Sequence, residues 1–385
     1  MYLLKNLYLQ NLLSFGPDAQ PLALGQLNVL IGPNGSGKSN LIEAIGLLAA
    51  SPRSLGEAIR EGGGVTEWLW KGSKRPIAAR FKAVVDIGGV QLSHEVLFTE
   101  VRQSLVLLDE RIERLADETL GSSVLVFGRV NGTPAIRVQG GTMHPIVQGF
   151  NIHESVLSQR RDPSSYQELS WVELTYNNIA LYRDWQFGRS APPRLPQPAD
   201  LPNTYLLADA RNLGLVLNQI RKNPEAKEAL LKHLSLVFEG VHDVDVSIVG
   251  GTVQVFLHEH KWIIPATRLS DGTLRWLALL AILLNPQERA IVCIEEPEMG
   301  LHPDLLPPLA RLLQEASQKM QIIVTTHSDV LVDALTDTPE SVIVCDRNEG
   351  STTMRRLTKE ELATWLEKYS LGQLWRSGEI GGNRW

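Results

Sequence analysis

Short apolar runs separated by polar turns dominate the first 140 residues of the chain. Runs over residues 2–9 and 27–31 have the length and composition of strands. Two further pairs of runs flank Gly88-Gly89 and Asn131-Gly132, which are sequences typical of tight turns, and each pair predicts a β-hairpin. We therefore expect an antiparallel β lobe in this part of the chain.

The pattern changes in the last third, where strands and helices alternate. Residues 273–284 are apolar nearly all round and predict a buried helix. Apolar strands are predicted at 290–294, 321–325 and 341–345, with an amphipathic helix over 305–320. This alternation predicts a parallel sheet with right-handed crossovers, flanked by helices.

The middle of the chain looks mainly helical. Residues 190–202 contain five prolines and predict a linker or an extended crossing segment. Strands return over 244–264, with Gly250-Gly251 as the turn. No heptad pattern is sustained for several turns, so we expect no long coiled coil. The predicted division is an N-terminal lobe over 1–150, a helical insertion over 151–243 and a C-terminal lobe over 244–385.

Composition narrows the class of protein. The chain has 385 residues, a net charge of −6 and 43% hydrophobic residues, and no apolar run approaches the ~18 residues that span a bilayer. The N-terminus does not resemble a signal peptide. Cys293 and Cys345 lie in apolar runs, so we expect reduced core thiols in a cytoplasmic protein. The net charge argues against a uniformly basic nucleic-acid binder but leaves room for a local basic face.

Residues 32–39 read GPNGSGKS and match the phosphate-binding P-loop pattern G-x-x-x-x-G-K-[ST]. The motif stands between the strand at 27–31 and a predicted helix at 40–50, where the helix N-terminus favours anions. Lys38 is expected to reach the β- and γ-phosphates, and the Ser39 hydroxyl a Mg²⁺ ion. A Gly-rich turn that matches by chance is the alternative, which the strand–helix context disfavours.

Carboxylates follow the apolar strand at 290–294. Glu295 and Glu296 suggest a Walker B motif, in which the first acid holds Mg²⁺ and the second polarises the attacking water. A solvated acidic turn is the alternative, and it accounts well for Glu298. His327 ends the next strand, so it is expected beside Glu296 and in contact with the γ-phosphate; a structural histidine is the alternative.

Ser270, Asp271 and Gly272 stand at the start of the predicted buried helix. From this motif alone we favour a helix N-cap by Ser270 or Asp271. A helix N-terminus of this kind is also an anion site.

Four motifs in this order, GPNGSGKSN, LSDGT, IEEPE and TTHS, resemble the ATPase heads of the ABC superfamily in its SMC and RecF-like branch. The opening LKNLYLQNLLSFG resembles the first strand of that branch. The resemblance implies an ABC-type P-loop ATPase head of the α/β class that binds ATP and Mg²⁺ and sandwiches ATP between two protomers. It implies a signature loop at Ser270, Asp271 and Gly272, a catalytic Glu296, a D-loop at 299–302 and a switch His327. The implied ATP-binding residues are Gly32, Pro33, Asn34, Gly35, Ser36, Gly37, Lys38, Ser39 and Asn40.

Two residues depart from the family pattern. Glu295 replaces the usual Walker B aspartate, and Asp271 stands where signatures often have glycine and is expected to cap the helix. A Mg²⁺-sensing glutamine normally lies in the middle region, and Gln159 is the candidate. The neighbouring Arg160-Arg161 pair is interpreted as a solvated face.

The function expected from this reading is an ATP-driven switch that closes as a homodimer and reopens on hydrolysis. The resemblance implies DNA maintenance or anti-phage defence, with a TOPRIM-type nuclease or DNA as partner and no membrane. Three alternatives remain: a stand-alone DNA-repair ATPase acting on ends or gaps, a non-hydrolysing ATP-bound scaffold, and, least favoured, an ABC transporter subunit.

Overall fold

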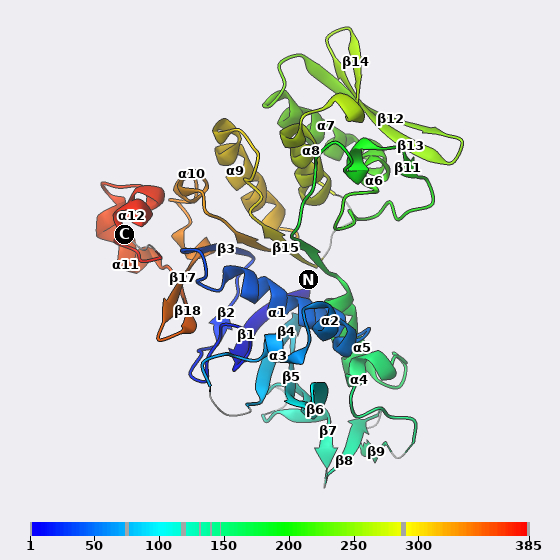
Figure 1. Cartoon of the computed structure of the whole chain (residues 1–385), viewed down its shortest axis with the longest axis vertical. Coiled ribbons are helices and arrows are strands. Elements are labelled where there is room, and N and C mark those ends of the chain that lie inside the picture. Colours follow the sequence, from blue (N-terminus) through cyan, green and yellow to red (C-terminus); the bar gives the residue numbers. More distant parts are fainter. Residues whose placement is uncertain are drawn as a thin grey trace. The chain divides into compact units, whose positions relative to one another are not determined.

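The computed structural model of the chain describes residues 2–73, 77–116, 121–130, 132–138, 141–146, 148–285 and 290–382. The chain divides into two units, each built from segments that are not consecutive (Figure 1). Unit 1 contains Met1–Ile179, Glu340–Leu357 and Ile380–Trp385, and unit 2 contains Ala180–Pro339 and Thr358–Glu379.

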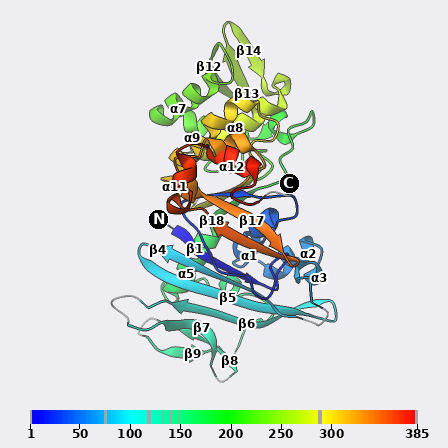
Figure 2. The same ribbon diagram turned by 90° about the vertical axis from the view of Figure 1, so that its left-hand side faces the viewer.

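An antiparallel sheet forms one layer of unit 1, and its long strands lie side by side in Figure 2. Both predicted hairpins are present: Ile87 pairs with Val90 across Gly88-Gly89, and Val130 pairs with Thr133, although Asn131 lies outside the described residues. The strand order is β2-β1-β4-β5-β6-β7-β8-β9. The strands are β1 (Tyr2–Gln10), β2 (Leu22–Ala23), β4 (Ala79–Ile87), β5 (Val90–Val101), β6 (Ser104–Arg114), β7 (Val124–Val130), β8 (Thr133–Arg137) and β9 (Met143–Pro145).

The P-loop belongs to the second layer of unit 1. Strand β3 (Leu27–Ile31) is wholly buried and leads through the loop into helix α1 (Lys38–Ala50). Strand β17 (Val342–Asn348) pairs parallel to β3, with Val342 opposite Val29, and β18 (Ser351–Arg356) pairs antiparallel to β17. The remaining helices of unit 1 are α2 (Leu55–Glu61), α3 (Val65–Trp68), α4 (Val156–Gln159) and α5 (Gln167–Asn177).

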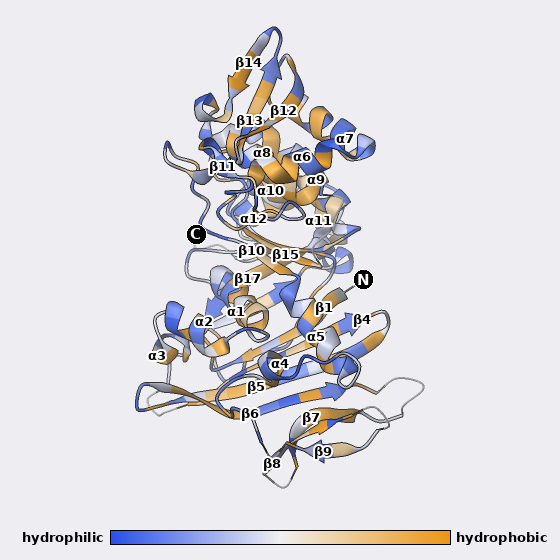
Figure 3. Ribbon diagram, turned by 90° about the vertical axis from the view of Figure 1, so that its right-hand side faces the viewer, coloured by the Kyte–Doolittle hydropathy of each residue, from blue (hydrophilic) through white to orange (hydrophobic). Residues whose placement is uncertain are grey.

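Parallel strands and their crossover helices form one part of unit 2, as the alternating pattern predicted. Strand β15 (Ile291–Glu295) pairs parallel to β16 (Gln321–Thr325), and helix α9 (Leu306–Ser317) connects them. Helix α8 (Asp271–Leu283) is buried from Thr273 to Leu283, in agreement with its hydrophobic colouring in Figure 3. Strand β10 (Ile179–Tyr182) and helix α10 (Asp329–Asp333) complete this part.

A second, antiparallel sheet lies in unit 2. Strands β12 (Val241–Val249) and β13 (Thr252–Glu259) form the expected hairpin at Gly250-Gly251. The other strands and the helices of this region are β11 (Gln197–Pro198), β14 (Trp262–Pro265), α6 (Leu213–Arg221) and α7 (Pro224–Ser235). The C-terminal region of unit 2 adds α11 (Lys359–Leu366) and α12 (Leu371–Ser377), and short 3₁₀ turns cover Pro192–Arg194, Ala266–Arg268, Pro303–Leu305 and Pro339–Ser341.

The fold class is therefore the mixed α/β class that the sequence predicted. The longest helices within the described residues, α1 and α8, have 13 residues each, so the expectation that this part of the chain holds no long coiled coil is confirmed. In the same residues, no helix combines the length and the apolar character that crossing a membrane requires.

Candidate functional site

The P-loop of unit 1 has the backbone of a phosphate cradle. Gly32, Gly35 and Gly37 all have positive φ angles, at 147°, 77° and 100°, which glycine adopts without strain. Gly37 is the N-cap of α1, so Lys38, Ser39 and Asn40 occupy the first turn of that helix. The Lys38 ammonium donates to the carbonyl oxygens of Gly32 at 2.7 Å and Pro33 at 3.1 Å, which folds its side chain over the loop.

The residues packed around the P-loop leave space for glycine only at Gly32 and Gly37, and one hydroxyl of the loop is unused in the part of the chain that the structure describes. A Cβ atom at Gly32 would overlap the Cys345 carbonyl, and one at Gly37 would overlap the Thr352 hydroxyl. The Thr352 hydroxyl also donates to the Ser36 carbonyl at 2.9 Å. Within the described residues, the buried Ser36 hydroxyl has no hydrogen-bond partner. A glycine-lined loop with an unused hydroxyl and a lysine over it fits the phosphates of a nucleotide.

A cavity of about 540 Å³ lies in unit 1 and shares a wall with the P-loop region. Its lining includes the aromatic side chains Phe15 and Trp70 and, next to the P-loop, Leu41 of α1 and Thr352 of β18. This volume falls within the ~300–1,000 Å³ typical of small-molecule sites.

Glu296 and His327 meet at the ends of two neighbouring strands of unit 2. Glu295 pairs with Thr325 in the parallel register of β15 and β16, and the Glu296 amide donates to the Thr325 carbonyl at 3.0 Å. The register therefore brings the next residues to the same edge, where His327 Nε2 lies 3.6 Å from Glu296 Oε1. Both side chains are more than a third exposed, so water reaches them.

Glu295 is held differently from Glu296. Its carboxylate is 18% exposed and accepts a hydrogen bond from Arg183 Nε at 3.2 Å. Burial raises the pKa of the Glu295 carboxyl, and Arg183 opposes this rise. A carboxylate oxygen suits Mg²⁺ chemically. The guanidinium of Arg183, already paired with Glu295, competes with Mg²⁺ for the same oxygen. No pattern in the sequence signals this ion pair.

Arg275 of α8 supports the backbone of Glu296. Its Nη1 donates to the Glu296 carbonyl at 3.1 Å, and its guanidinium lies 5.5 Å from the ring centre of Trp185 and 5.6 Å from that of Phe187. Glu296 has φ 43°, in the left-handed region that is unfavourable for a residue with a side chain. The sequence signal for this contact is a charged residue, Arg275, within the otherwise apolar 273–284 stretch.

The signature residues begin helix α8. The Ser270 hydroxyl accepts from the Thr273 amide at 3.0 Å, so Ser270 is the N-cap. Asp271 instead pairs with the buried Arg194, which also donates to backbone carbonyls before the helix. A Cβ atom at Gly272 would lie 2.7 Å from the Gly300 carbonyl, so the signature and the 299–302 loop approach each other closely.

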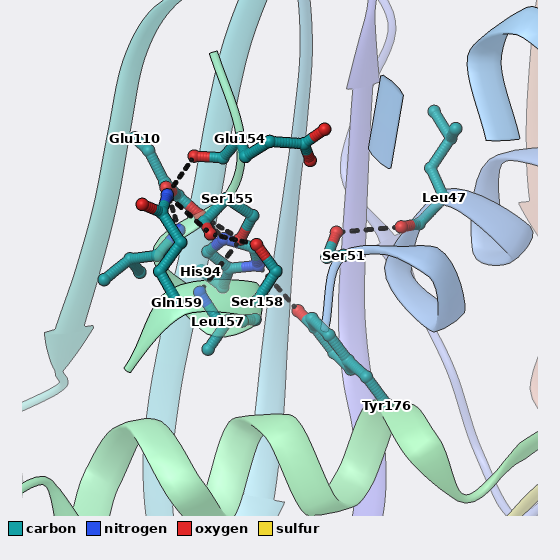
Figure 4. Close-up of polar contacts among 11 residues, drawn as sticks. Leu47, Ser51, His94, Glu110, Glu154, Ser155, Leu157, Ser158, Gln159 and Tyr176 are labelled. Atoms are coloured by element: carbon teal, nitrogen blue, oxygen red, sulfur yellow. Dashed lines mark hydrogen bonds and ion pairs between the residues drawn. The ribbon is translucent and has the colours of Figure 1, made fainter. Parts of the chain in front are cut away.

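Gln159 lies in unit 1, where its amide holds its own loop together. Oε1 accepts from the Asn151 amide at 2.7 Å, and Nε2 donates to the carbonyls of Asn151 and Glu154 at 2.9 and 3.0 Å. Figure 4 shows Gln159 beside a buried network in which Glu110 accepts from the Ser155 hydroxyl and contacts His94. A magnesium-sensing role for Gln159 would require these loop contacts to be exchanged.

Comparison with known proteins identifies a matching family and solved structures with a similar fold. The family model described as "AAA domain, putative AbiEii toxin, Type IV TA system" matches residues 27–129 and 160–333. A solved Smc head bound to the C-winged helix domain of ScpA aligns with a TM-score of 0.57 at 15% identity, covering 93% of this chain and 99% of that one.

Two further Smc heads also align. The head from Pyrococcus furiosus, bound to the C-terminal domain of ScpA, gives a TM-score of 0.57 at 14% identity, and the head from Pyrococcus yayanosii gives 0.51 at 14% identity. Each alignment covers 96% of this chain and 99% of the other. The likeness to the Smc heads is one of fold. Since the family model covers well over half of the chain, this protein belongs to that AAA-domain family.

Proposed function

We propose that the protein is an ATP-hydrolysing switch that closes as a head-to-head homodimer on ATP and reopens after hydrolysis. The observation that carries the proposal is the pair of Glu296 and His327, whose side chains lie 3.6 Å apart at adjacent strand ends and stay accessible to water. A carboxylate and an imidazole in this arrangement suit the orientation of an attacking water and contact with a phosphoryl group.

Each residue has a stated task in this proposal. The P-loop amides and Lys38 bind the phosphates, and the cavity beside Leu41 and Thr352 receives the nucleoside. Glu296 orients and polarises the water, and His327 contacts the terminal phosphate. Ser39 and Glu295 would hold Mg²⁺, with Gln159 as a third candidate. The ion, when bound, supplies charge neutralisation on the phosphates.

Closure of two copies accounts for the signature loop. The N-terminus of α8, capped by Ser270, carries the positive end of the helix dipole, which favours anions. In the proposed dimer, this helix N-terminus of one copy meets the γ-phosphate bound by the P-loop of the other. We place the switch in DNA maintenance or anti-phage defence, in the cytoplasm, with a TOPRIM-type nuclease or DNA responding to the closed state. The toxin–antitoxin wording in the family description is compatible with defence.

The central experiment uses Glu296→Gln, with Glu360→Gln on the exposed face of α11 as the matched control. The Glu296 variant should bind ATP with unchanged affinity, lose turnover and accumulate dimer in light scattering, whereas the control behaves like wild type. Wild-type turnover in Glu296→Gln would place the base elsewhere. Lys38→Ala should abolish binding of ATP, and retained affinity would refute the P-loop assignment.

Dimer geometry has its own test. Ser270→Arg should block ATP-dependent dimerisation while the monomer still binds ATP. Because Ser270 caps α8, Ser270→Ala is the matched control for the lost cap, which is worth about 1 kcal/mol. An unchanged dimer in the arginine variant would refute the arrangement in trans.

Two functional alternatives give different results in the same assays. Turnover that DNA stimulates, with a steep dependence on salt, would favour a stand-alone DNA-repair ATPase. ATP-dependent dimerisation without any turnover in the wild type would favour the non-hydrolysing scaffold.

A further inference from the structure

Glu298, which the sequence pattern assigned to a solvated turn, is instead enclosed in unit 2. Its Oε1 accepts two hydrogen bonds, from the Thr326 hydroxyl at 2.6 Å and from the His327 amide at 2.9 Å. The carboxylate thus joins the turn after β15 to the first residues after β16. The solvated-turn interpretation of Glu298 is wrong because parallel pairing of the two strands brings the second loop over this side chain.

The hydrogen bond from the His327 amide to Glu298 positions His327 itself. With its amide bound to Glu298, His327 has a fixed backbone, and its ring lies 3.6 Å from Glu296 Oε1. The Thr326 hydroxyl also accepts from the Ser328 amide at 3.0 Å, and Ser328 caps α10. Glu298 therefore anchors the whole stretch from Thr326 to the start of α10.

Only half of the carboxylate is used in this way. Among the residues that the structure describes, the buried Oε2 atom of Glu298 has no hydrogen-bond partner. An unsatisfied buried polar atom costs free energy, so a carboxyl group at this position is expensive for stability alone. A carboxyl group at this position is explained if Oε1, which accepts the hydrogen bonds from Thr326 and His327, has a functional role that an apolar side chain could not fill.

We propose that Glu298 is a positioning residue for turnover, which fixes His327 beside Glu296 through the Thr326 hydroxyl and the His327 amide. The proposal rests on the proposed function, since it assumes that the Glu296–His327 pair acts in hydrolysis. Glu298 does not reach the reacting atoms itself in this proposal; it acts through the loop that it holds.

The kinetic test compares Glu298→Ala with Glu298→Gln, whose remaining carbonyl oxygen still accepts both hydrogen bonds. Glu298→Ala should lower kcat by roughly 10- to 100-fold, the scale of a misplaced catalytic group, with KM and the Kd for ATP within about twofold. The glutamine variant should recover most of the loss. Adding Glu298→Ala to His327→Ala should cost nothing further, because both changes remove the same contribution.

A second readout does not depend on turnover. The ring resonances of His327, identified by their loss in His327→Ala, should shift or broaden in Glu298→Ala and stay in place in Glu298→Gln. Unchanged resonances, or a turnover loss that adds to that of His327→Ala, would overturn the proposal. If the His327 resonances move in Glu298→Ala but Glu296→Gln turns over normally, the positioning contact stands and the proposed function is refuted.

Folding is controlled separately. If Glu298→Ala fails to fold, Thr326→Val removes at constant shape the hydroxyl that donates to Glu298, together with the acceptor of the Ser328 amide. It leaves the bond from the His327 amide to Glu298 and should give a smaller loss of kcat and a partial shift of the same ring resonances. Wild-type kcat and unmoved His327 resonances in a folded Thr326→Val variant would count against the proposal.

Discussion

Removing the guanidinium of Arg275 should weaken unit 2 and slow turnover together. Arg275→Met keeps an unbranched apolar side chain in the buried helix but loses the hydrogen bond to the Glu296 carbonyl and the contacts with the rings of Trp185 and Phe187. The hydrogen bond from a charged donor is worth ~1.5–3 kcal/mol. The two ring contacts add roughly 1–2 kcal/mol between them.

Part of this loss in the free energy of unfolding is offset, because the substitution also removes a buried charge. Burial lowers the pKa of Arg275, which shows that the charged form is poorly solvated, and methionine removes that cost. We therefore expect a net loss of about 2–3 kcal/mol in the free energy of unfolding. For a domain of this size that corresponds to a fall in Tm of roughly 4–12 °C.

The same change should affect chemistry, because Arg275 holds the backbone of a residue in the left-handed region. Glu296 is free to relax once its carbonyl loses this donor, and kcat should fall by roughly 10- to 100-fold with little change in ATP affinity. Arg268→Met, at an exposed position just before α8, is the matched control and should behave like wild type. A Tm within about 1 °C of wild type, with normal kcat, would refute the reasoning.

Three further changes probe other features. Gly37→Ala should abolish ATP binding, because its φ of 100° costs an L-residue about 1–2 kcal/mol and its methyl group would overlap the Thr352 hydroxyl; retained affinity in a nucleotide titration would contradict this. Burial lowers the pKa of His233 from 6.5, so the unfolded chain takes up this proton first as the pH falls, and the protein should lose stability as the pH falls below 6.5. His233→Gln should lack this part of the pH dependence of Tm, and an identical slope would exclude His233 as its source. Arg183→Gln should free Glu295 and lower the Mg²⁺ concentration that half-saturates nucleotide binding by roughly two- to fivefold, whereas an increase would mean that Arg183 assists the site.

Local patterns predicted most of the elements near the site. The strand at 321–325 is found with the same bounds, and the strand before the P-loop also agrees. Each of these segments is a short, mainly apolar run, residues 322–324 in one and 29–31 in the other, and polar or glycine residues mark its limits in the sequence. Strand β6 and helices α11 and α12 are not among the predicted elements. Charged residues interrupt the alternation of β6, and the two helices are short and mix polar with apolar residues.

Contacts between distant charges could not be predicted. Arg183 meets Glu295 across 112 positions of sequence, and Arg194 meets Asp271 across 77. Hydrophobic periodicity predicts where helices and strands lie along the sequence. It does not indicate which charged side chains become buried as ion pairs. The placement of His327 beside Glu296 was foreseen because strand ends in a parallel sheet share one edge, and this rule depends on topology alone.

The pairing of β3 with β17 also governs how the protein forms. The P-loop strand is made within the first 31 residues, yet its parallel neighbour in unit 1 is Val342–Asn348. Since synthesis proceeds from the N-terminus, a nascent chain carries its complete P-loop motif long before the strand that supports it leaves the ribosome. The ability to bind nucleotide should therefore appear late in translation, and chains released before residue 342 should lack it.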